Sequence, residues 1–483
     1  MILSAFNLYA HDLPEPGEVL VHNTFSGAYL VLDSDVFAAL EKRDRGEALD
    51  ECERALVDDP DFAASDIGIV VADRDDEARA FEAWFDARRQ QAEMRAIVAI
   101  NRACNFDCPY CCQAESMDGA VMTPATVEKT ATWLAQRARA VGTPSLQVTF
   151  VGGEPLLHPE RIRQLMSSLQ RQLASTEIAV SMGVITNGYF LTEDMIAALQ
   201  PLGLRIAQVT IDGDERTHSR SRVSKQGEDT FARIFQNVLD ASRHIQIVVN
   251  GNYQEDTISG FAPLIRKLSE AGFPTTHRIS FSPALDILDA PAGSGSGSCT
   301  WSQSSHHYQV ALHDQLVRHG YPTSPLHSVG PCAFNSHHMY VVDVDGSLLK
   351  CPGFLGHPEW NIGDVERGLG ERYGALLRLD RSATCGGCAH RPDCAGGCIA
   401  NALIRSGEPD TGYDSSMIND HCEIEYLQNV TRDALVRAYL LATSPDAEAA
   451  LADFPAAALE LPAAALTDSR ERGVRSASLN VLR

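Results

Sequence analysis

Three closely spaced cysteines could hold a metal–sulfur group. Cys104, Cys108 and Cys111 lie in the segment NRACNFDCPYCC with C-x3-C-x2-C spacing. An iron–sulfur cube takes four thiolate ligands, so a set of three leaves one iron free to bind another molecule. Thiolates bind zinc as well as iron, and a zinc site is therefore the alternative interpretation. The neighbouring Cys112 is out of register and is predicted to be a buried or bystander thiol.

The segments around this triplet alternate between strand and helix patterns. The cysteines directly follow the apolar run 94–100, so they are predicted to open a loop at the C-terminal end of a buried strand. Further β-rich runs cover residues 146–155, 178–192 and 206–222, and helical patterns cover 123–141 and 158–173. Strands that alternate with helices favour a parallel α/β sheet or barrel whose strand C-termini carry the site.

Polar residues and glycines stand at the ends of the later runs. They are Gly152, Gly153 and Glu154 after the second run, Asn187 after the third, and Asp212 with Gly213 after the fourth. Each position also has an ordinary explanation. A GGEP segment is often a plain turn, Asn187 could cap a strand in a tight turn, and Arg222 could be a solvated surface charge.

The cysteine triplet, the aromatic Tyr110 before its last member and the GGEP segment at 152–155 together resemble the radical S-adenosylmethionine (radical SAM) superfamily. The resemblance implies a partial (β/α)6 barrel and a 4Fe–4S cluster on Cys104, Cys108 and Cys111. The vacant iron would chelate the amino and carboxylate groups of S-adenosylmethionine. Reductive cleavage would then give methionine and a 5′-deoxyadenosyl radical that abstracts a substrate hydrogen.

The same resemblance implies residues that contact the cofactor. The backbone of the glycine turn would suit the amino group, because glycines permit close main-chain approach. Asn187 resembles the ribose-contacting position and Arg222 a carboxylate contact, whereas Asp212 receives no role beyond its place at a strand end. The implied cofactor-binding set is Tyr110, Gly152, Gly153, Glu154, Asn187 and Arg222. A flavodoxin or ferredoxin type protein would supply the electron.

A second group of cysteines lies in the last third of the chain. Cys332, Gly346 and Cys351 form a C-x13-G-x4-C pattern, and CGGCAHRPDCAGGC adds C-x2-C-x5-C-x3-C. Its seven thiols are Cys332, Cys351, Cys385, Cys388, Cys394, Cys398 and Cys422. Seven thiols in about ninety residues exceed what structural burial requires. Disulfides and zinc ribbons are the alternatives to iron–sulfur clusters.

These seven positions resemble the SPASM domain, which follows radical SAM barrels that modify peptides and proteins. The resemblance implies two auxiliary 4Fe–4S clusters, three clusters in all. A complete set would consist of Cys385, Cys388, Cys394 and Cys422. The other set, Cys332, Cys351 and Cys398, is one ligand short. Either Cys299 completes it across a long loop or the fourth position is open, and we favour an open site or a non-cysteine ligand.

Composition and charge restrict the class of protein. The length of 483 residues supports two to four domains, and 44% hydrophobic residues suffice for real cores. The chain has no run of eighteen apolar residues and no signal-peptide pattern at its start, which together with the cysteine content predicts a cytoplasmic enzyme without a membrane span. The formal charge of −24 argues against nucleic-acid binding and is compatible with a basic peptide partner or simply with solubility.

Five segments follow from these patterns. Residues 1–92 are predicted to form a small α+β module with two strands joined at Ser26–Gly27, and Cys52 within it is predicted to be buried. The module resembles the winged-helix-like units that bind a leader peptide as an added strand, and a plain packing extension of the barrel is the alternative. The other segments are the barrel (93–288), a linker and bridging helix (289–325), the SPASM-like region (326–425), and a C-terminal helix and tail (426–483).

The resemblance favours radical modification of a ribosomally made peptide, by a thioether, C–C or C–O crosslink or a related oxidation. One alternative is sulfatase maturation to formylglycine. It is weakened because those enzymes carry Asp directly after the second SPASM cysteine, where this chain has Pro352. A second alternative is an electron-transfer or redox-sensing protein without radical chemistry. No general base can be named from the sequence, and the candidates are Asp212, Glu215, His218, Asp343, Asp345 and the tyrosines.

Overall fold

The computed structural model describes most of the chain up to residue 403. The described residues are 2–13, 15–58, 68–111, 113–253, 257–283, 306–322, 332–378, 385, 387–397, 399–400 and 403. Several predicted features lie outside them. These are the linker at 289–299, the helix at 423–442, the tail from 443, and Cys112, Cys299, Cys398 and Cys422.

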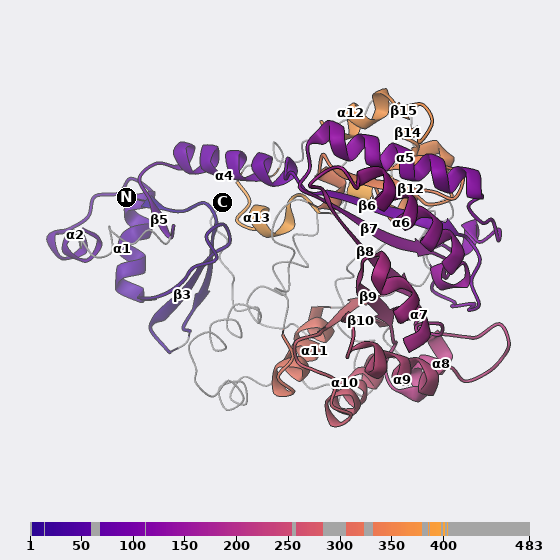
Figure 1. Cartoon of the computed structure of the whole chain (residues 1–483). Helices are drawn as coiled ribbons and strands as arrows, with labels where there is room; N and C mark the ends of the chain where they lie inside the picture. The colour runs from indigo at the N-terminus through magenta and orange to yellow at the C-terminus, as the bar shows by residue number, and fades with distance from the viewer. Residues whose placement is uncertain are drawn as a thin grey trace.

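Six parallel strands form the centre of the molecule (Figure 1). They are β6 (Met94–Asn101), β7 (Ser145–Gly152), β8 (Ala179–Thr186), β9 (Leu204–Thr210), β10 (Gln246–Tyr253) and β11 (Arg278–Pro283). Each pairs in parallel with the next, so their C-terminal ends lie along one edge of the sheet. This arrangement confirms the predicted partial (β/α)6 barrel. Four of its strands overlap the four runs predicted from the sequence, although the fourth run, 206–222, also contains helix α8 (Glu215–Ser221).

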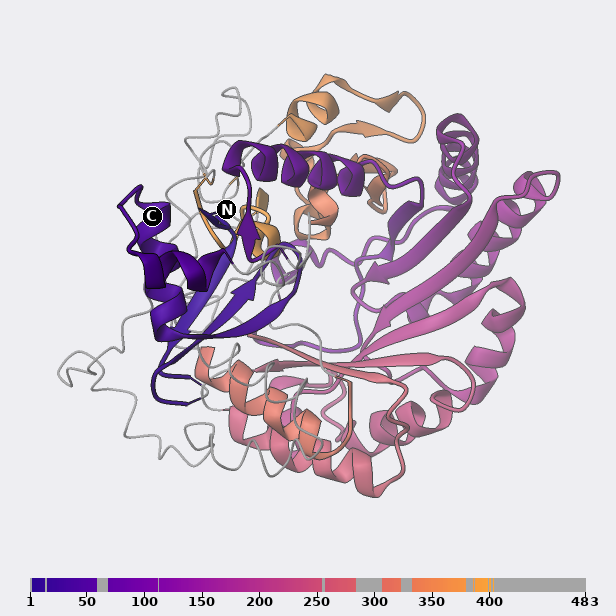
Figure 2. The same cartoon turned by 90° about the vertical axis from the view of Figure 1, so that its left-hand side faces the viewer.

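Helices connect the strands and cover the outer face of the curved sheet (Figure 2). They are α5 (Pro124–Val141), α6 (Pro159–Leu173), α7 (Glu193–Leu199), α8 (Glu215–Ser221), α9 (Phe231–Ala241) and α10 (Phe261–Glu270). The ends of α5 follow from local chemistry, because the Thr123 side chain caps its N-terminus and Gly142 ends it in the left-handed conformation. In β7, Leu146, Val148 and Phe150 are fully buried and alternate with half-buried residues, as expected for a sheet covered on one side by helices.

The cysteine-rich region continues the barrel sheet beyond β6. Strand β12 (Met339–Val342) pairs in parallel with β6, and β13 (Ser347–Leu349), β14 (Gly363–Asp364) and β15 (Gly368–Leu369) follow it in antiparallel order. Helix α11 (His306–Arg318), predicted near 303–319, packs against α10 and β11. Two short helices, α12 (Glu371–Leu377) and α13 (Arg391–Cys394), complete the described part of this region.

The N-terminal residues form the predicted α+β module. Strands β2 (Asn7–His11), β3 (Glu18–Asn23) and β4 (Tyr29–Asp33) make an antiparallel sheet, and β1 (Ile2–Leu3) pairs with β5 (Val70–Val71). Helices α1 (Ser34–Asp44), α2 (Glu51–Val57) and α4 (Arg74–Arg89) complete it. The β3–β4 turn contains Ser26–Gly27 as predicted, and the φ of Gly27 is 75°, which favours glycine.

The prediction that Cys52 is buried is wrong, because its side chain is exposed. It lies on α2, a short helix that buries only Val57 against the module core. Five residues separate the two positions, which places Cys52 about 140° around the helix from the buried side.

The N-terminal module packs against the segment that carries the later cysteines. Phe6, Phe81 and Phe85 form one apolar cluster with Ala395. The Thr24 hydroxyl donates to the carbonyl of Ala389 at 2.6 Å. Figure 1 likewise places α13 beneath α4. The module therefore contacts residues 389–395 directly.

Among the described helices, none is long and apolar enough to cross a bilayer.

Candidate active site

The three-cysteine loop starts where β6 ends. Asn101, the last residue of β6, shapes it by accepting the N–H of Ala103 at 2.9 Å and by donating to the carbonyl of Glu154 at 2.9 Å. The loop also pairs with the segment after α8, through Asp107 N–H to Val223 O at 2.8 Å. Its thiols, Cys104, Cys108 and Cys111, are all half-buried. The loop is thus fixed from two sides at the predicted end of the strand.

The glycines after β7 are required by the cysteine loop itself. Gly152 has a φ of 146°, and a Cβ atom there would overlap the carbonyl oxygen of Asn101. A Cβ atom on Gly153 would overlap the carbonyl oxygen of Ala103 in the same way. The backbones are in hydrogen-bond contact, with Glu154 N–H donating to Ala103 O at 2.8 Å. Sequence reasoning expected close approach of a cofactor, but the structure gives the glycines a nearer partner, the backbone of the cysteine loop.

Glu154 joins the ends of β7 and β8. Its fully buried carboxylate accepts hydrogen bonds from Thr186 Oγ1 at 2.8 Å, Asn187 N at 2.8 Å and Leu156 N at 3.0 Å. Burial raises the pKa of Glu154, and these hydrogen bonds oppose the shift. The Glu154 carboxylate therefore has a structural role, because it joins the residues after β7 to the end of β8.

Asn187 is buried between β8 and the cysteine loop. Its side-chain oxygen accepts the N–H of Tyr189 at 2.9 Å, which is the tight turn that the sequence allowed. Its side-chain nitrogen donates to Asn105 Oδ1 at 2.7 Å, so the same residue also contacts the cysteine loop. Asn187 thus contacts both its own turn and the cysteine loop, and its implied contact with a ribose stays a prediction.

Tyr110 and Asp212 connect the cysteine loop to the ends of β9 and β10. The Tyr110 hydroxyl donates to the fully buried carboxylate of Asp212, which also accepts the N–H of Asn252 at 2.8 Å. Burial raises the pKa of Asp212, and the guanidinium of Arg222 opposes this shift. Sequence reasoning left Asp212 without a role, and nothing local could have revealed its partner, because Tyr110 is 102 residues away.

Arg222 belongs to this same group. Its Nη1 donates to the Tyr110 hydroxyl at 3.1 Å, and its guanidinium lies 5.5 Å from the centroid of the Phe106 ring. The alternative of a solvated surface charge is therefore wrong. Its Nε is buried and has no hydrogen-bond partner within the described part of the chain.

The other candidate bases differ in position. His218 is fully buried, its Nδ1 accepts the N–H of Asp212 at 3.3 Å, and burial lowers its pKa to about 3, so it is neutral. Asp343 accepts Arg102 Nε at 3.3 Å and Gly356 N at 2.7 Å, which ties the cysteine loop to the C-terminal region. Asp345 accepts the N–H of Ser347 in an exposed turn.

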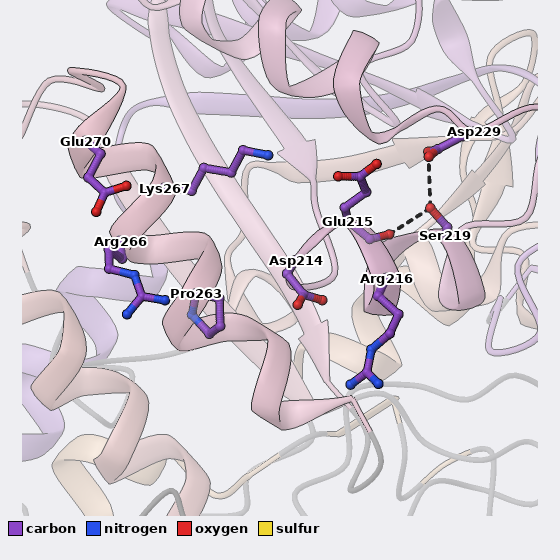
Figure 3. A pocket seen from close by; sticks show the side chains of 9 residues that line it. All are labelled: Asp214, Glu215, Arg216, Ser219, Asp229, Pro263, Arg266, Lys267 and Glu270. Atoms are coloured by element: carbon purple, nitrogen blue, oxygen red, sulfur yellow. Dashed lines mark hydrogen bonds between the residues drawn. The ribbon is translucent and has the colours of Figure 1, made fainter.

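A separate hollow of about 830 Å³ lies between α8 and α10 on the outer helices (Figure 3). Glu215, the remaining candidate base, lines it together with Arg216, Arg266 and Lys267. The Ser219 hydroxyl in this hollow is a donor, lying 3.1 Å from Asp229 Oδ1 and 2.7 Å from the carbonyl oxygen of Glu215. The hollow contains none of the cysteines and none of the implied cofactor contacts, so Glu215 is not brought into the cysteine site.

The later cysteines occupy two places in the fold. Cys332 and Cys351 flank β12 and β13, and Cys351 Sγ accepts the N–H of Gly353 at 3.4 Å. Cys385, Cys388 and Cys394 lie in one tightly turned segment beside the N-terminal module. Its turns are held by Cys388 N–H to Cys385 O at 2.9 Å and by Cys394 N–H to His390 O at 2.8 Å.

The thiols of the cysteine loop are of the ligand type that an iron–sulfur cube requires. Among the described residues, no three His, Cys, Asp or Glu side chains are gathered closely enough for one metal ion. A cube attaches each thiolate to a different iron, so its ligands lie further apart than those of a zinc ion. The half-buried thiols of Cys104, Cys108 and Cys111 match a cube by ligand type and number.

Comparison with known proteins identifies the barrel. Residues 98–284 match the model of the radical SAM superfamily. The GTP 3′,8-cyclase of Xanthomonas axonopodis pv. citri (strain 306) is 26% identical over 227 residues, which cover 45% of this chain and 61% of that protein. The PqqA peptide cyclase of Gluconobacter oxydans (strain 621H) is 30% identical over 117 residues, 24% of this chain and 30% of that protein. The chain thus spans less than two thirds of the length of these curated relatives.

A solved structure shares the fold over a longer range. Native anSMEcpe with bound AdoMet and Cp18Cys peptide matches with a TM-score of 0.54 at 16% identity, covering 72% of this chain and 99% of that chain. At this identity the likeness concerns the fold alone. The matched family and the cysteine triplet at the end of β6 together show that this chain contains a radical SAM domain at residues 98–284.

Proposed function

We propose that this protein uses S-adenosylmethionine to modify a ribosomally made peptide, forming a thioether, C–C or C–O crosslink or a related oxidation. The observation that carries the proposal is the meeting of the three-cysteine loop with the ends of β7, β8 and β9. Glu154, Asn187 and Asp212, one from each of these ends, are all held within a shared hydrogen-bond system around that loop.

Cys104, Cys108 and Cys111 would hold a 4Fe–4S cluster with one iron left for S-adenosylmethionine. When bound and reduced, this group supplies a 5′-deoxyadenosyl radical. The residues proposed to orient the cofactor are Tyr110, Gly152, Gly153, Glu154, Asn187 and Arg222. Among these residues, Arg222 is the best-supported contact, and its proposed partner is the carboxylate of S-adenosylmethionine. Its buried Nε has no partner in the described chain, and a guanidinium binds carboxylates well.

The chain's own residues would orient the cofactor by fixing the loop. Asn187 holds Asn105 beside Cys104, and Tyr110 is anchored between Asp212 and Arg222. Because the chain's own residues make these contacts, they would hold the loop that carries the three thiols in place for binding. Removing one anchor should therefore affect cofactor binding without changing a ligand thiol.

We propose that the later cysteines hold two auxiliary clusters. Cys385, Cys388 and Cys394 would be joined by Cys422, and Cys332 and Cys351 by Cys398. When a substrate radical closes a new bond it loses one electron, and auxiliary clusters would provide the acceptor. The second set is one thiolate short, so its fourth position is proposed to be open or to take a non-cysteine ligand. A flavodoxin or ferredoxin type donor would reduce the barrel cluster.

Two comparisons support a peptide substrate. The matched anSMEcpe structure contains a peptide together with AdoMet, and one relative is a PqqA peptide cyclase. The N-terminal module would bind a leader segment of that peptide along β4, which is an edge of the β2-β3-β4 sheet. Residues 1–92 contain 21 Asp and Glu against 8 Lys and Arg, a net −13, which favours a leader with basic residues.

The test is anaerobic reconstitution with iron and sulfide, followed by S-adenosylmethionine, a reductant and the peptide encoded next to this gene. We expect 5′-deoxyadenosine and a peptide that has lost two hydrogens, whereas an epimerisation leaves the mass unchanged and is detected by deuterium uptake. The matched control is Cys108→Ala, which should abolish both products. Reconstituted protein that binds zinc in place of iron would refute the proposal. Iron-loaded protein that never cleaves S-adenosylmethionine would also refute it and would leave an electron carrier.

A nucleotide substrate is the second candidate, because GTP 3′,8-cyclases are among the relatives of the barrel. The seven later cysteines and the acidic N-terminal module favour the peptide. Replacing the peptide by GTP in the same assay separates the two, since a nucleotide cyclase would consume GTP and leave the peptide mass unchanged.

A further inference from the structure

Residues 216–227, which we call the basic segment, carry positive charge in a strongly acidic chain. They contain Arg216, Arg220, Arg222 and Lys225 and no Asp or Glu, whereas the whole chain has a formal charge of −24. Arg216, Arg220 and Lys225 are exposed. Neither Arg216 nor Lys225 has an ion-pair partner among the described residues, so both charges are available to a molecule that binds from solvent.

The basic segment is bonded directly to the cysteine loop. The N–H of Asp107 donates to the carbonyl of Val223 at 2.8 Å, and the N–H of Lys225 donates to the carbonyl of Asn105 at 3.0 Å. The residues between these two bonds form an antiparallel bridge. The three loop residues in this pairing stand between the first two thiols of the triplet. The basic segment therefore lies beside the proposed ligands of the barrel cluster.

The pairing directs side chains alternately inward and outward. In extended chains, successive side chains point to opposite faces. Phe106 and Ser224, at the bridge, are buried, while Asp107, Val223 and Lys225 beside them are exposed. Val223 is 42% exposed and is one of two large apolar side chains that are exposed in the described part of the chain. The solvent-facing side of the pairing thus presents an apolar residue, a lysine and one carboxylate.

An acidic redox protein fits this surface. The proposed function requires one electron from a flavodoxin or ferredoxin type protein, and electron transfer between proteins requires a short distance between the redox groups. Such partners associate through small interfaces that opposite charges steer into register. An exposed apolar side chain with cations on both sides matches an acidic partner of this kind. The leader peptide of the proposed function is basic, and the same cations would repel it.

We propose that the basic segment, with Val223 at its centre, is the docking surface for an acidic one-electron donor protein that reduces the cluster on Cys104, Cys108 and Cys111. The inference rests on the proposed function, because it requires that cluster. In the transfer, one electron leaves the reduced donor and converts one ferric iron of the cluster to ferrous iron. No bond forms or breaks.

The experiment measures binding of an acidic plant-type [2Fe–2S] ferredoxin to the reconstituted full-length chain by calorimetry. Arg216→Glu/Lys225→Glu reverses two charges of the basic segment. We expect its dissociation constant for ferredoxin to rise at least about tenfold at low ionic strength, and the difference to shrink in high salt, which screens exposed charges. Arg216→Gln/Lys225→Gln, the milder second variant, should give a smaller rise with the same salt dependence.

The matched control is Arg163→Glu/Arg171→Glu, which makes the same change in net charge. Both residues are exposed on α6, among the helices on the outer face of the sheet. This variant should bind ferredoxin like the parent. Thermal unfolding and iron content are measured first for every variant.

The second readout is the rate of cluster reduction, followed by absorbance. Dithionite is a small reductant that needs no docking surface, so it serves as the comparison for reduced ferredoxin. The variant with two reversed charges in the basic segment should be reduced at least about tenfold more slowly than the parent by ferredoxin. Dithionite should reduce the two proteins equally fast.

The outcomes separate this inference from the proposed function. If the parent does not bind ferredoxin, or if the basic-segment and α6 variants weaken binding equally, the docking surface is refuted. Loss of peptide binding with unchanged ferredoxin binding would also refute it and would assign the surface to the substrate. Formation of 5′-deoxyadenosine by the parent with dithionite tests the proposed function separately. If none forms, the proposed function fails, while the binding comparison still decides whether the basic segment binds an acidic protein.

Discussion

The hydroxyl of Tyr110, in the cysteine loop, donates a hydrogen bond to the buried carboxylate of Asp212, which follows β9. Two residues 102 positions apart thus hold the cysteine loop against the barrel. Arg222 and Asn252 also contact this pair, so the loop, β9 and β10 meet at one point.

Asp212→Asn should weaken this anchor. The neutral amide cannot accept every donor and leaves Arg222 without its buried counter-charge, so we expect a loss of about 1–3 kcal/mol in the free energy of unfolding. S-adenosylmethionine cleavage should fall at least tenfold. Urea unfolding and 5′-deoxyadenosine formation check the two effects. Asp345→Asn, in an exposed turn, is the control and should change stability by less than about 0.5 kcal/mol.

Glu154→Gln should destabilise the edge formed by β7 and β8. The carboxylate accepts three hydrogen bonds in a fully buried place, and an amide would direct N–H groups at one or more of those donors. We expect a loss of about 1–3 kcal/mol, measured by chemical unfolding. Glu177→Gln changes the same chemistry on an exposed residue and should have little effect. Equal losses in both variants would contradict the role given to Glu154.

Gly153→Ala should displace the cysteine loop. The new Cβ atom would overlap the carbonyl oxygen of Ala103, and the backbone on both sides must shift to accept it. We expect a loss of about 1–3 kcal/mol in stability and reduced iron binding at the barrel site. Iron content after reconstitution is the measurement. Gly374→Ala, in α12, meets only the flexible end of Arg378 and should bind iron normally.

Arg391→Met should loosen the contact between the N-terminal module and the later cysteines. Arg391 is buried, pairs with Glu82 and lies 4.5 Å from the centroid of the Phe81 ring. We expect faster hydrogen exchange in residues 387–397 and a loss of about 1–3 kcal/mol. Arg45→Met removes an exposed ion pair with Glu47 and should leave stability almost unchanged. Unchanged exchange in Arg391→Met would count against the contact.

His218 should make the protein less stable in acid. Burial lowers its pKa from 6.5 to about 3, so the unfolded state takes up a proton first as the pH falls. The contribution of His218 to the free energy of unfolding is therefore fully present above about pH 6.5 and is lost as the pH falls toward 3. At pH 5 the loss should be about 2 kcal/mol. Urea unfolding at pH 7 and pH 5 measures this loss in the parent and in His218→Asn. The variant should lose about 2 kcal/mol less than the parent between these two pH values. An identical loss in both proteins would argue against a neutral, buried His218.

The sequence determined the elements and the order of the chemical groups. Apolar runs and helical spacing are local properties, so β6 to β9, α5, α6 and the Ser26–Gly27 turn could be predicted, as could the place of the cysteines after β6. The matched radical SAM family agrees with the residues that suggested it.

Only the tertiary structure decided which groups meet. Four contacts join segments far apart in the chain. They are Asp212 with Tyr110, Arg222 with Phe106, Gly153 with the backbone of Ala103, and the N-terminal module with residues 389–395. The exposure of Cys52 likewise depends on which side of α2 faces the core. Local patterns carry no information about such contacts, because they arise from how the completed strands and helices pack together.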